Sequence, residues 1–320
     1  MKMTYRFFVS ALMLIFTGSC ATKYYENPVI NMDVPDPSVI RVGETYYAAG
    51  TSGDAQPVYP IFKSDNLVDW TPVGHIFNSF PKWTKGAFWA PELFQHKGKT
   101  FCYYTAKRKS DGISCIGVAV ADRPEGPYVD HGMLLDCDKE AIDAYAIEVD
   151  GQLWVVYKAY GLNPERPIEL LAQRLTSDGL NLEGAPVSLL ADMENIGMEG
   201  ESIFKSGEYF YILYAARDCC SPKSDYEVRV ARSKSFTGPY EKYKGNPILV
   251  GDGVVFQSAG HGTQVVTPSG RMYYLCHAYE EGKYKEGRKP VLHELKIGAD
   301  GWPHFVTGTK TQQRVKMPEL

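Results

Sequence analysis

The sequence lacks several features that would have pointed to other classes of protein. Beyond the first twenty residues no apolar pattern of helical period continues over three turns, which argues against a helical bundle. The 38 Asp and Glu nearly balance the 34 Lys and Arg, and the net charge of −4 comes without a run of one sign, so the basic footprint of a nucleic-acid-binding protein is excluded. The spacing of the seven cysteines matches no zinc motif. What remains is a chain rich in aromatic residues, which make up 13% of it.

The first apolar segment is too short to cross a membrane. Residues 7–16 form an apolar run flanked by Lys2 and Arg6, whereas a transmembrane helix needs about 20 such residues. The run leads through small residues to Cys20, an order that resembles a bacterial lipoprotein cleavage site. We therefore expect residues 1–19 to be a signal peptide and Cys20 to carry lipid, which would place the protein in the periplasm or on the outer membrane. The alternative is a plain signal peptide that is cut nearby.

Export would expose the remaining cysteines to an oxidising compartment, where disulfides form. They are Cys102, Cys115, Cys137, Cys219, Cys220 and Cys276. Because Cys102 and Cys115 lie in adjacent apolar runs joined by a turn, we expect them to be neighbours in a hairpin. Disulfides and buried thiols are equally expected for this set.

A five-fold repeat is the dominant feature of the chain. In each copy a polar or acidic cluster precedes a few apolar residues, a glycine turn and an aromatic-rich run that ends near alanine. The turn glycines are Gly43, Gly98, Gly151, Gly207 and Gly270, spaced by 53 to 63 residues. A period near fifty filled with short strands is the signature of a β-propeller with one four-stranded sheet per repeat. We predict an all-β fold, a five-bladed β-propeller with four-stranded antiparallel blades, in which residues 28–320 form a single domain.

The propeller geometry predicts where the chemistry is located. The first strand of every blade runs beside the central axis, so the residues that begin these strands converge on one small space. They are Asp36, Trp89 with Glu92, Asp143, Glu199 and His261.

Three carboxylates at one end of the axis favour glycoside hydrolysis. That reaction needs one carboxylic acid to protonate the leaving oxygen and a second carboxylate to activate water or attack the sugar. A third carboxylate nearby can raise the pKa of the acid, since like charges resist ionising together. A single acid at a strand start more often binds backbone amides or solvent. Asp36, Asp143 and Glu199, however, occur in register in three separate repeats.

The segments around these residues resemble glycoside hydrolase family 43. The resemblance is carried, in chain order, by Val34-Pro35-Asp36-Pro37, Phe88-Trp89-Ala90-Pro91-Glu92, Ala141-Ile142-Asp143-Ala144, Gly197-Met198-Glu199-Gly200, Gly260-His261 and Gly287-Arg288. It spans nearly the whole chain after the leader. It implies a five-bladed propeller and an enzyme that inverts configuration at arabinose, xylose or sometimes galactose.

The resemblance also implies a role for each site residue. Asp36 would be the general base that activates water, Glu199 the general acid, and Asp143 the residue that orients Glu199 and raises its pKa. Arg288 would bind substrate hydroxyls. His261 would sit at the axis, where some family members hold a calcium ion through water; no cofactor is expected to be required.

Two positions depart from the family pattern. Asp143 is followed by Ala144, and Glu199-Gly200 is followed by Glu201, where relatives often have proline. Glu201 is therefore a second candidate for the general acid, although we retain Glu199.

Other residues near the axis have more than one interpretation. Trp89 is equally expected to bind a sugar ring by stacking or to pack between blades. Glu92 is expected to line the pocket or to be structural, His277 to be a satisfied core histidine, and Tyr145 to pack between blades.

These features predict an exported, membrane-tethered, inverting and exo-acting glycosidase. Its substrates would be arabinofuranosyl side chains of plant polysaccharides such as arabinan, arabinoxylan or pectin. A β-xylosidase or exo-galactanase of the same fold is the alternative within this chemistry. A non-catalytic sugar-binding lipoprotein is disfavoured by the presence of all three acids. A retaining, fructan-cleaving propeller is disfavoured because its Arg-Asp-Pro triplet is not found in the middle blade.

Overall fold

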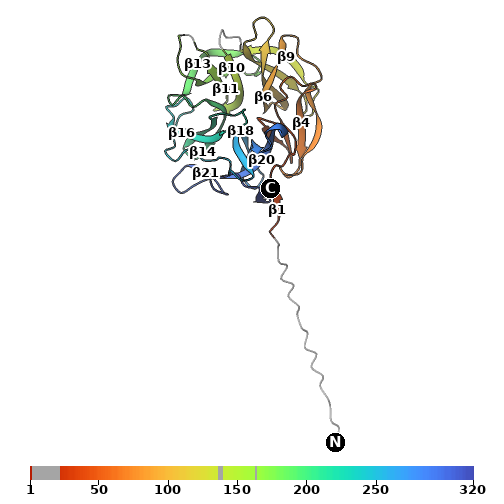
Figure 1. The fold of residues 1–320 in the computed structure, drawn as a ribbon. Coiled ribbons are helices and arrows are strands. Elements are labelled where there is room, and N and C mark those ends of the chain that lie inside the picture. Colours follow the sequence, from red (N-terminus) through yellow and green to blue (C-terminus); the bar gives the residue numbers. More distant parts are fainter. Residues whose placement is uncertain (2–21, 136–139, 163) are drawn as a thin grey trace.

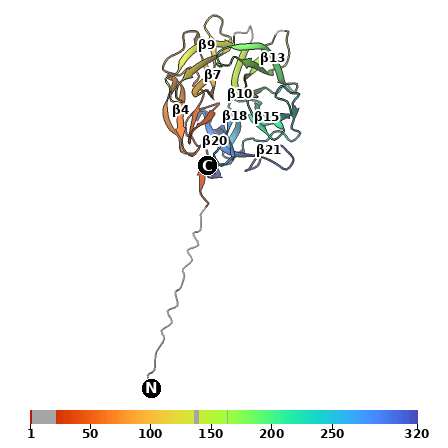
Figure 2. The same cartoon turned by 180° about the vertical axis from the view of Figure 1, so that it is seen from behind.

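Five four-stranded antiparallel sheets surround a central channel in the computed structural model of the protein (Figures 1 and 2). The structure describes residue 1 and residues 22–135, 140–162 and 164–320, so the expected signal peptide, Cys20 and Cys137 lie outside the described residues. The predicted five-bladed β-propeller is confirmed. In the described part of the chain no helix has the length and apolar character needed to cross a bilayer.

Each blade is formed by four consecutive strands, ordered from the axis outward. Blade 1 contains β2 (Ser38–Val42), β3 (Thr45–Ala49), β4 (Val58–Ser64) and β5 (Thr71–Phe77). Blade 2 contains β6 (Thr84–His96), β7 (Lys99–Arg108), β8 (Ser114–Ala121) and β9 (Val129–Leu135). Blade 3 contains β10 (Glu140–Val149), β11 (Gln152–Tyr160), β12 (Glu169–Leu175) and β13 (Leu182–Ala191). Blade 4 contains β14 (Met198–Ser206), β15 (Tyr209–Ala216), β16 (Glu227–Ser233) and β17 (Glu241–Lys242). Blade 5 contains β18 (Phe256–Val266), β19 (Met272–Glu280), β20 (Arg288–Ile297) and β21 (Pro303–Phe305), with the 3-10 helix η1 (Tyr284–Glu286) before β20.

The inner strands of neighbouring blades contact each other around the whole ring. The contacts run from β2 to β6, β10, β14, β18 and back to β2. The five turn glycines that define the repeat join the first and second strands and all have positive φ, between 58 and 82°. Glycine tolerates this left-handed conformation better than other residues, which explains its recurrence at these turns.

Aromatic residues fill the space between the blades. Tyr59, Phe88 and Tyr104 form one such cluster between blades 1 and 2, with the Tyr59 and Phe88 rings in edge-to-face contact at 5.7 Å. Because a blade is covered on both faces by its neighbours, successive residues of its middle strands can be buried rather than alternating between core and solvent. The eight residues of β8 are all buried, for example.

The first and last strands of the chain pair with each other beside blade 5. Strand β1 (Tyr24–Glu26) pairs with β22 (Arg314–Lys316), and Figures 1 and 2 show β1 beside the C-terminus. The Asn27 side chain accepts a hydrogen bond from the backbone N–H of Leu292 and donates one to its carbonyl. These contacts attach the N-terminal segment to β20.

Cys102 and Cys115 lie in one hairpin, as expected, but they are not neighbours in it. Cys102 and Cys115 do lie on the paired strands β7 and β8, but Cys102 is opposite Ala119 and the two cysteines are not in register. The disulfide of the structure instead joins the adjacent residues Cys219 and Cys220.

Candidate active site

A residue with left-handed backbone recurs in the inner part of every blade. These residues are Asp36 (φ 54°), Ala90 (φ 40°), Asp143 (φ 59°), Gly200 (φ 57°) and His261 (φ 42°). In β6, β10, β14 and β18 a bulge at this place interrupts the pairing register with the second strand. Bulges re-aim side chains, and non-glycine residues hold this backbone conformation only where the surroundings impose it. The strained backbone therefore presents functional side chains at one end of the channel.

The residues singled out from the sequence meet in one pocket at that end. A cavity of about 230 Å³ is lined by Asp36, Trp89, Ile142, Asp143, Glu199, Cys219, Cys220, His261 and Arg288. Glu92 and Glu201 are not among the lining residues. Glu92 lies further along the channel, where it lines a separate hollow of about 340 Å³ with Tyr145 and Gln264.

Asp36 is buried among positively charged and hydrogen-bonding groups. The Thr51 hydroxyl donates to Oδ2 at 2.6 Å, Arg288 Nη1 donates to Oδ1 at 3.1 Å, and His261 Nδ1 lies 3.4 Å from Oδ1. The backbone N–H of Asp36 donates to His277 Nδ1 at 3.0 Å. Burial alone would raise the pKa of Asp36, but Arg288, His261 and His277 outweigh it and hold that pKa well below its usual value. Asp36 is therefore a carboxylate.

Glu199 differs from the sequence-based expectation. Lys158 Nζ, from the second strand β11, donates to Oε2 at 2.6 Å, and the Tyr226 hydroxyl donates to Oε1 at 2.8 Å. Burial favours the protonated form, but these two donors outweigh it and lower the pKa of Glu199. The expected rise in the pKa of Glu199 is wrong for the free pocket, because the expectation did not include the buried ammonium of Lys158.

The raised pKa belongs to Asp143 instead. Burial raises the pKa of Asp143 to about 6; His261 opposes the rise and the charge of Glu199 adds to it. The nearest His261 nitrogen is 3.9 Å from Oδ2, a weaker pairing than Lys158 gives Glu199. The backbone N–H of Asp143 donates to Thr105 Oγ1 at 3.1 Å, which holds the bulge of β10 against β7.

The bulge at Gly200 separates the two candidate acids of blade 4. A Cβ on Gly200 would lie 2.5 Å from the His261 ring, so a larger residue would displace that ring. Beyond the bulge, Glu201 is buried and both its carboxylate oxygens lack a hydrogen-bond partner among the described residues. Burial raises its pKa well above the usual value. Glu199, and not Glu201, reaches the pocket.

Four contributors to the site were not identified from the sequence. They are Thr51, Lys158, Tyr226 and the Cys219–Cys220 disulfide. Lys158 alone had a recognisable signal, since it is a charge inside an apolar strand, and buried charges are kept only where they are paired.

The structure gives a position for each of the residues near the axis that had more than one interpretation. His277 is a core histidine, as expected, but it is only partly satisfied: Nδ1 accepts the Asp36 backbone N–H, and Nε2 has no hydrogen-bond partner among the described residues. Tyr145 packs between blades, where its hydroxyl donates to the Ile203 carbonyl. Trp89 is half-buried in the pocket wall, with Lys107 Nζ 5.4 Å from its ring.

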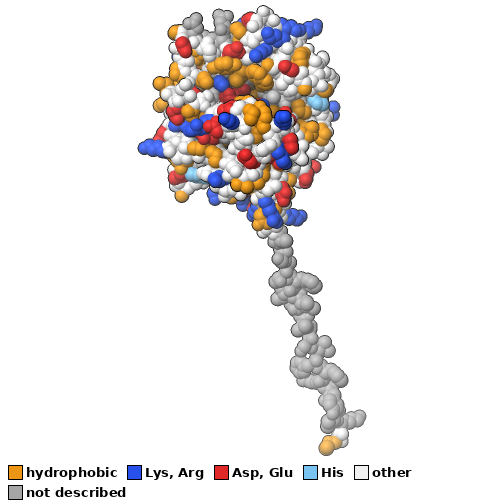
Figure 3. All heavy atoms as spheres, in the orientation of Figure 1, with side chains coloured by type: hydrophobic (Ala, Val, Ile, Leu, Met, Phe, Trp, Pro, Cys, Tyr) orange, Lys and Arg blue, Asp and Glu red, His pale blue; other side chains and the backbone are white. Residues whose placement is uncertain are grey.

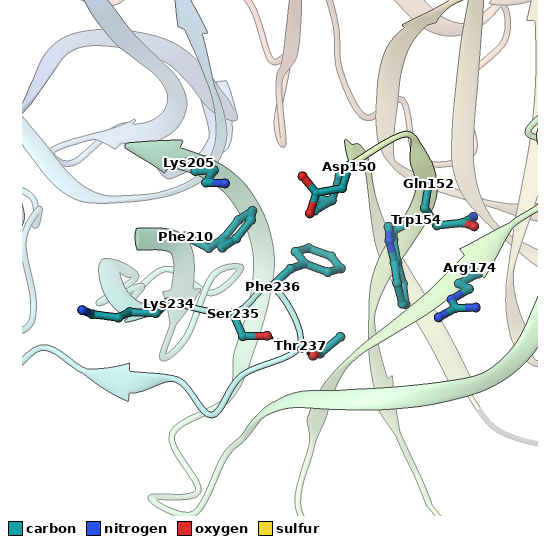
Figure 4. A pocket seen from close by; sticks show the side chains of 11 residues that line it. Asp150, Gln152, Trp154, Arg174, Lys205, Phe210, Lys234, Ser235, Phe236 and Thr237 are labelled. Atoms are coloured by element: carbon teal, nitrogen blue, oxygen red, sulfur yellow. Dashed lines mark hydrogen bonds between the residues drawn. The ribbon is translucent and has the colours of Figure 1, made fainter. Parts of the chain in front are cut away.

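A larger hollow elsewhere lacks the required acids. It measures about 530 Å³ and lies between blades 3 and 4 (Figure 4). Asp150 is the one carboxylate in its lining, and the Trp154, Phe210 and Phe236 rings that face it are packed against one another at 5.1 and 5.7 Å. One carboxylate cannot supply both an acid and a base.

No direct metal cage is evident in the described part of the chain. Residues 22–135, 140–162 and 164–320 contain no group of three or more His, Cys, Asp or Glu side chains that could hold an ion. A calcium ion bound by His261 through water stays a prediction. The face shown in Figure 3 carries acidic and basic side chains intermingled, in keeping with the small net charge.

Comparison with known proteins identifies the family. The model of glycosyl hydrolases family 43 matches residues 25–303. The chain belongs to this family. It is therefore a glycoside hydrolase of an inverting family, within a group whose members act on polysaccharides containing arabinose or xylose.

Similar family 43 proteins include enzymes of different specificity. The extracellular exo-alpha-(1->5)-L-arabinofuranosidase ArbA of Cellvibrio japonicus is 29% identical, over 92% of this chain and 91% of the relative. The non-reducing end alpha-L-arabinofuranosidase BoGH43B of Bacteroides ovatus is 28% identical, over 97% of this chain, and the xylan 1,3-beta-xylosidase of a Vibrio species 26%, over 93%. This chain spans 60% of the length of the latter two. The crystal structure of a thermostable family-43 glycoside hydrolase superposes with a TM-score of 0.81 at 26% identity, over 92% of this chain and 100% of that one.

Proposed function

We propose that this family 43 enzyme is an exo-acting α-L-arabinofuranosidase. The observation that carries the proposal is the small pocket lined by Asp36, Asp143 and Glu199. Its volume of about 230 Å³ is below the range of roughly 300–1,000 Å³ typical of ligand pockets, so it suits one terminal sugar better than a chain passing through. The exo-arabinofuranosidase named above, which matches this chain over nearly its whole length, also supports this choice.

Asp36 activates the attacking water. Its low pKa keeps it ionised, and Thr51 and Arg288 hold its two oxygens in place. The water gives one proton to Asp36 as its oxygen bonds to the anomeric carbon. The bond from that carbon to the leaving oxygen breaks at the same time, and the leaving oxygen takes a proton from Glu199.

Asp143 and Glu199 hold that proton as a pair. In the free pocket the pKa of about 6 puts it on Asp143, while Lys158 keeps Glu199 ionised. The proton therefore has to pass from Asp143 to Glu199 before Glu199 gives it to the leaving oxygen, and both carboxyls are ionised after the transfer. Two neighbouring buried carboxyls titrate as a unit, so the basic limb of the pH–rate profile belongs to the pair. Asp143 thereby modulates the acid, as the family resemblance implies.

A panel of aryl glycosides tests the function. The purified protein is assayed with 4-nitrophenyl α-L-arabinofuranoside, β-D-xylopyranoside and β-D-galactopyranoside, and the anomer first released is followed by proton NMR. We expect the largest kcat/KM on the arabinofuranoside, with inversion. A larger kcat/KM on the xyloside would instead establish a β-xylosidase, the second candidate, which the similarity to the Vibrio xylosidase favours.

Export and lipidation complete the proposal. The relative ArbA is named as extracellular, and Cys20 follows a leader that resembles a lipoprotein signal. Replacing Cys20→Ser should release the protein from membranes into the soluble periplasmic fraction, because acyl chains anchor by hydrophobic burial. If the variant fractionates with the membrane as the wild type does, the protein is not anchored through Cys20.

A further inference from the structure

A disulfide between adjacent residues forms part of the pocket wall. Cys219 and Cys220 are bonded to each other and line the same cavity as the three acids. Cys219 is half-buried and Cys220 is exposed, so the disulfide is open to the pocket rather than part of the core. The loop that carries it joins β15 to β16.

Hydrogen bonds from two blades hold this loop in place. The backbone N–H of Cys220 donates to Asp218 Oδ1 at 3.1 Å, and its carbonyl accepts the Tyr284 hydroxyl at 2.9 Å. Ser224 Oγ donates to Ser258 Oγ at 2.8 Å. Tyr284 and Ser258 belong to blade 5, so the loop that carries the disulfide is held between blades 4 and 5 beside the pocket.

The disulfide is part of the apolar surface of the pocket, together with Trp89 and Ile142. Asp36, Asp143, Glu199, His261 and Arg288 offer charge and hydrogen bonds to sugar hydroxyls. The remaining lining residues besides the cysteines are Trp89 and Ile142. A disulfide has no N–H or O–H group and its sulfurs are polarisable, which suits contact with the C–H face of a sugar ring.

We propose that the Cys219–Cys220 disulfide is a substrate-binding wall that contacts the apolar face of the terminal pentose. The inference rests on the glycosidase function proposed above. A bonded pair of cysteines is shorter than an aromatic side chain and has less freedom than two separate thiols. The wall therefore leaves room for one ring and presents a preformed surface to it, which favours binding.

The test compares the wild type with the double variant Cys219→Ser/Cys220→Ser. The dissociation constants of L-arabinose and D-xylose are measured by calorimetry, and KM and kcat are measured on the preferred aryl glycoside. We expect the dissociation constant of the preferred pentose and KM to rise about tenfold, the effect of losing roughly 50 Å² of apolar contact. The value of kcat and the pH profile should stay as in the wild type, because contact with a non-reacting face stabilises ground and transition states equally.

Two controls separate binding from folding. Cys102→Ala, a change to a buried thiol of β7 outside the pocket lining, should leave KM unchanged. Dithiothreitol added to folded wild type should reproduce the rise in KM and should have no effect on the double variant, which excludes reduction elsewhere as the cause.

Unchanged pentose affinity and KM in the double variant would overturn the proposal. A fall in kcat with a shifted pH profile would also overturn it, because the loop would then act through Tyr226 on Glu199 and not on the sugar. If the wild type hydrolyses none of the glycosides but binds a pentose more tightly than the double variant does, the proposed glycosidase function is wrong. The proposed contact between the disulfide and the sugar is then still supported. If it binds neither pentose, the wall fails as well.

Discussion

Two groups of buried carboxyls lie along the propeller axis, and they differ in their neighbours. Asp36, in the pocket, is 7% exposed, and Glu92, further along the channel, is 5% exposed. Arg288 and two histidines surround Asp36, whereas Glu92 accepts the Ser38 hydroxyl at 2.6 Å. The pKa of Asp36 is lowered, but burial raises that of Glu92 to about 8. At equal burial, nearby cations decide whether a carboxyl is ionised.

The two glutamates of blade 4 show the same difference between a paired and an unpaired carboxyl. The pKa of Asp143, in blade 3, lies between theirs. Glu199 is paired with Lys158, whereas Glu201 forms no ion pair with any described residue and its pKa is raised well above the usual value. Asp143 lies 3.9 Å from His261 and has a pKa of about 6. A proton can therefore be exchanged near neutral pH at Asp143, while Asp36 and Glu199, with their lowered pKa values, stay ionised.

The largest expected effect compares Asp36 with Glu92. Asp36→Asn removes the base that accepts the proton of water, and kcat/KM should fall about 10²–10⁴-fold on every glycoside. Glu92→Gln is the matched control, because an amide resembles a protonated carboxyl, and its kcat/KM should stay within about threefold of wild type. Steady-state kinetics on the panel measure both. A Glu92 variant as damaged as the Asp36 variant would show that ionisation does not distinguish the two groups.

Glu199 and Glu201 can be distinguished by the leaving group. Glu199→Ala should lose about 10²–10⁴-fold in kcat on glycosides with poor leaving groups, which need protonation, and much less on aryl glycosides whose leaving group is a stable anion. Glu201→Ala should show no such dependence, since Glu201 does not reach the pocket. If the dependence follows Glu201 instead, the acid has to be reassigned to that residue.

Glu201 should lower the stability of the fold, because its buried carboxyl has no ion-pair partner among the described residues, whereas Glu199 is paired with Lys158. Replacing the unpartnered carboxyl by an apolar side chain of similar length, Glu201→Met, should stabilise the protein by about 1–3 kcal/mol at pH 7. The raised pKa of Glu201 means that its contribution is favourable below its unfolded pKa near 4.5 and is lost as pH rises toward the folded value. The gain in the variant should therefore grow from pH 5 to pH 8 in thermal unfolding curves. A gain that does not change with pH would show that Glu201 does not titrate on unfolding.

The fold and the meeting of the acids could be predicted because both follow from the repeat. Gly43 and its four equivalents mark the turns, and equivalent positions of a propeller converge on its axis. The protonation states could not be predicted in this way. Lys158 comes from a second strand, and only the folded backbone brings its ammonium to Glu199.

The spacing of the repeat also could not predict the bulge at Gly200 or the Cys219–Cys220 disulfide. The left-handed turn at Gly200 breaks the alternation of the strand, so spacing alone does not say which of its neighbours faces the pocket. The bond between Cys219 and Cys220 depends on the conformation of the loop between β15 and β16, which the repeat does not define.

The smallest expected effect concerns Asp143. In Asp143→Asn the carboxyl that holds the proton and its charge are both lost, so Glu199 alone, with its pKa lowered by Lys158, has to retain a proton. The basic limb of the kcat/KM profile should move to lower pH, by about one unit for each 1.4 kcal/mol of lost interaction. Asp150→Asn is the control, since Asp150 lies in the separate hollow of Figure 4 and asparagine tolerates its left-handed backbone. If the basic limb of the profile stays at the same pH in the Asp143 variant, Glu199 gains and loses its proton independently of Asp143.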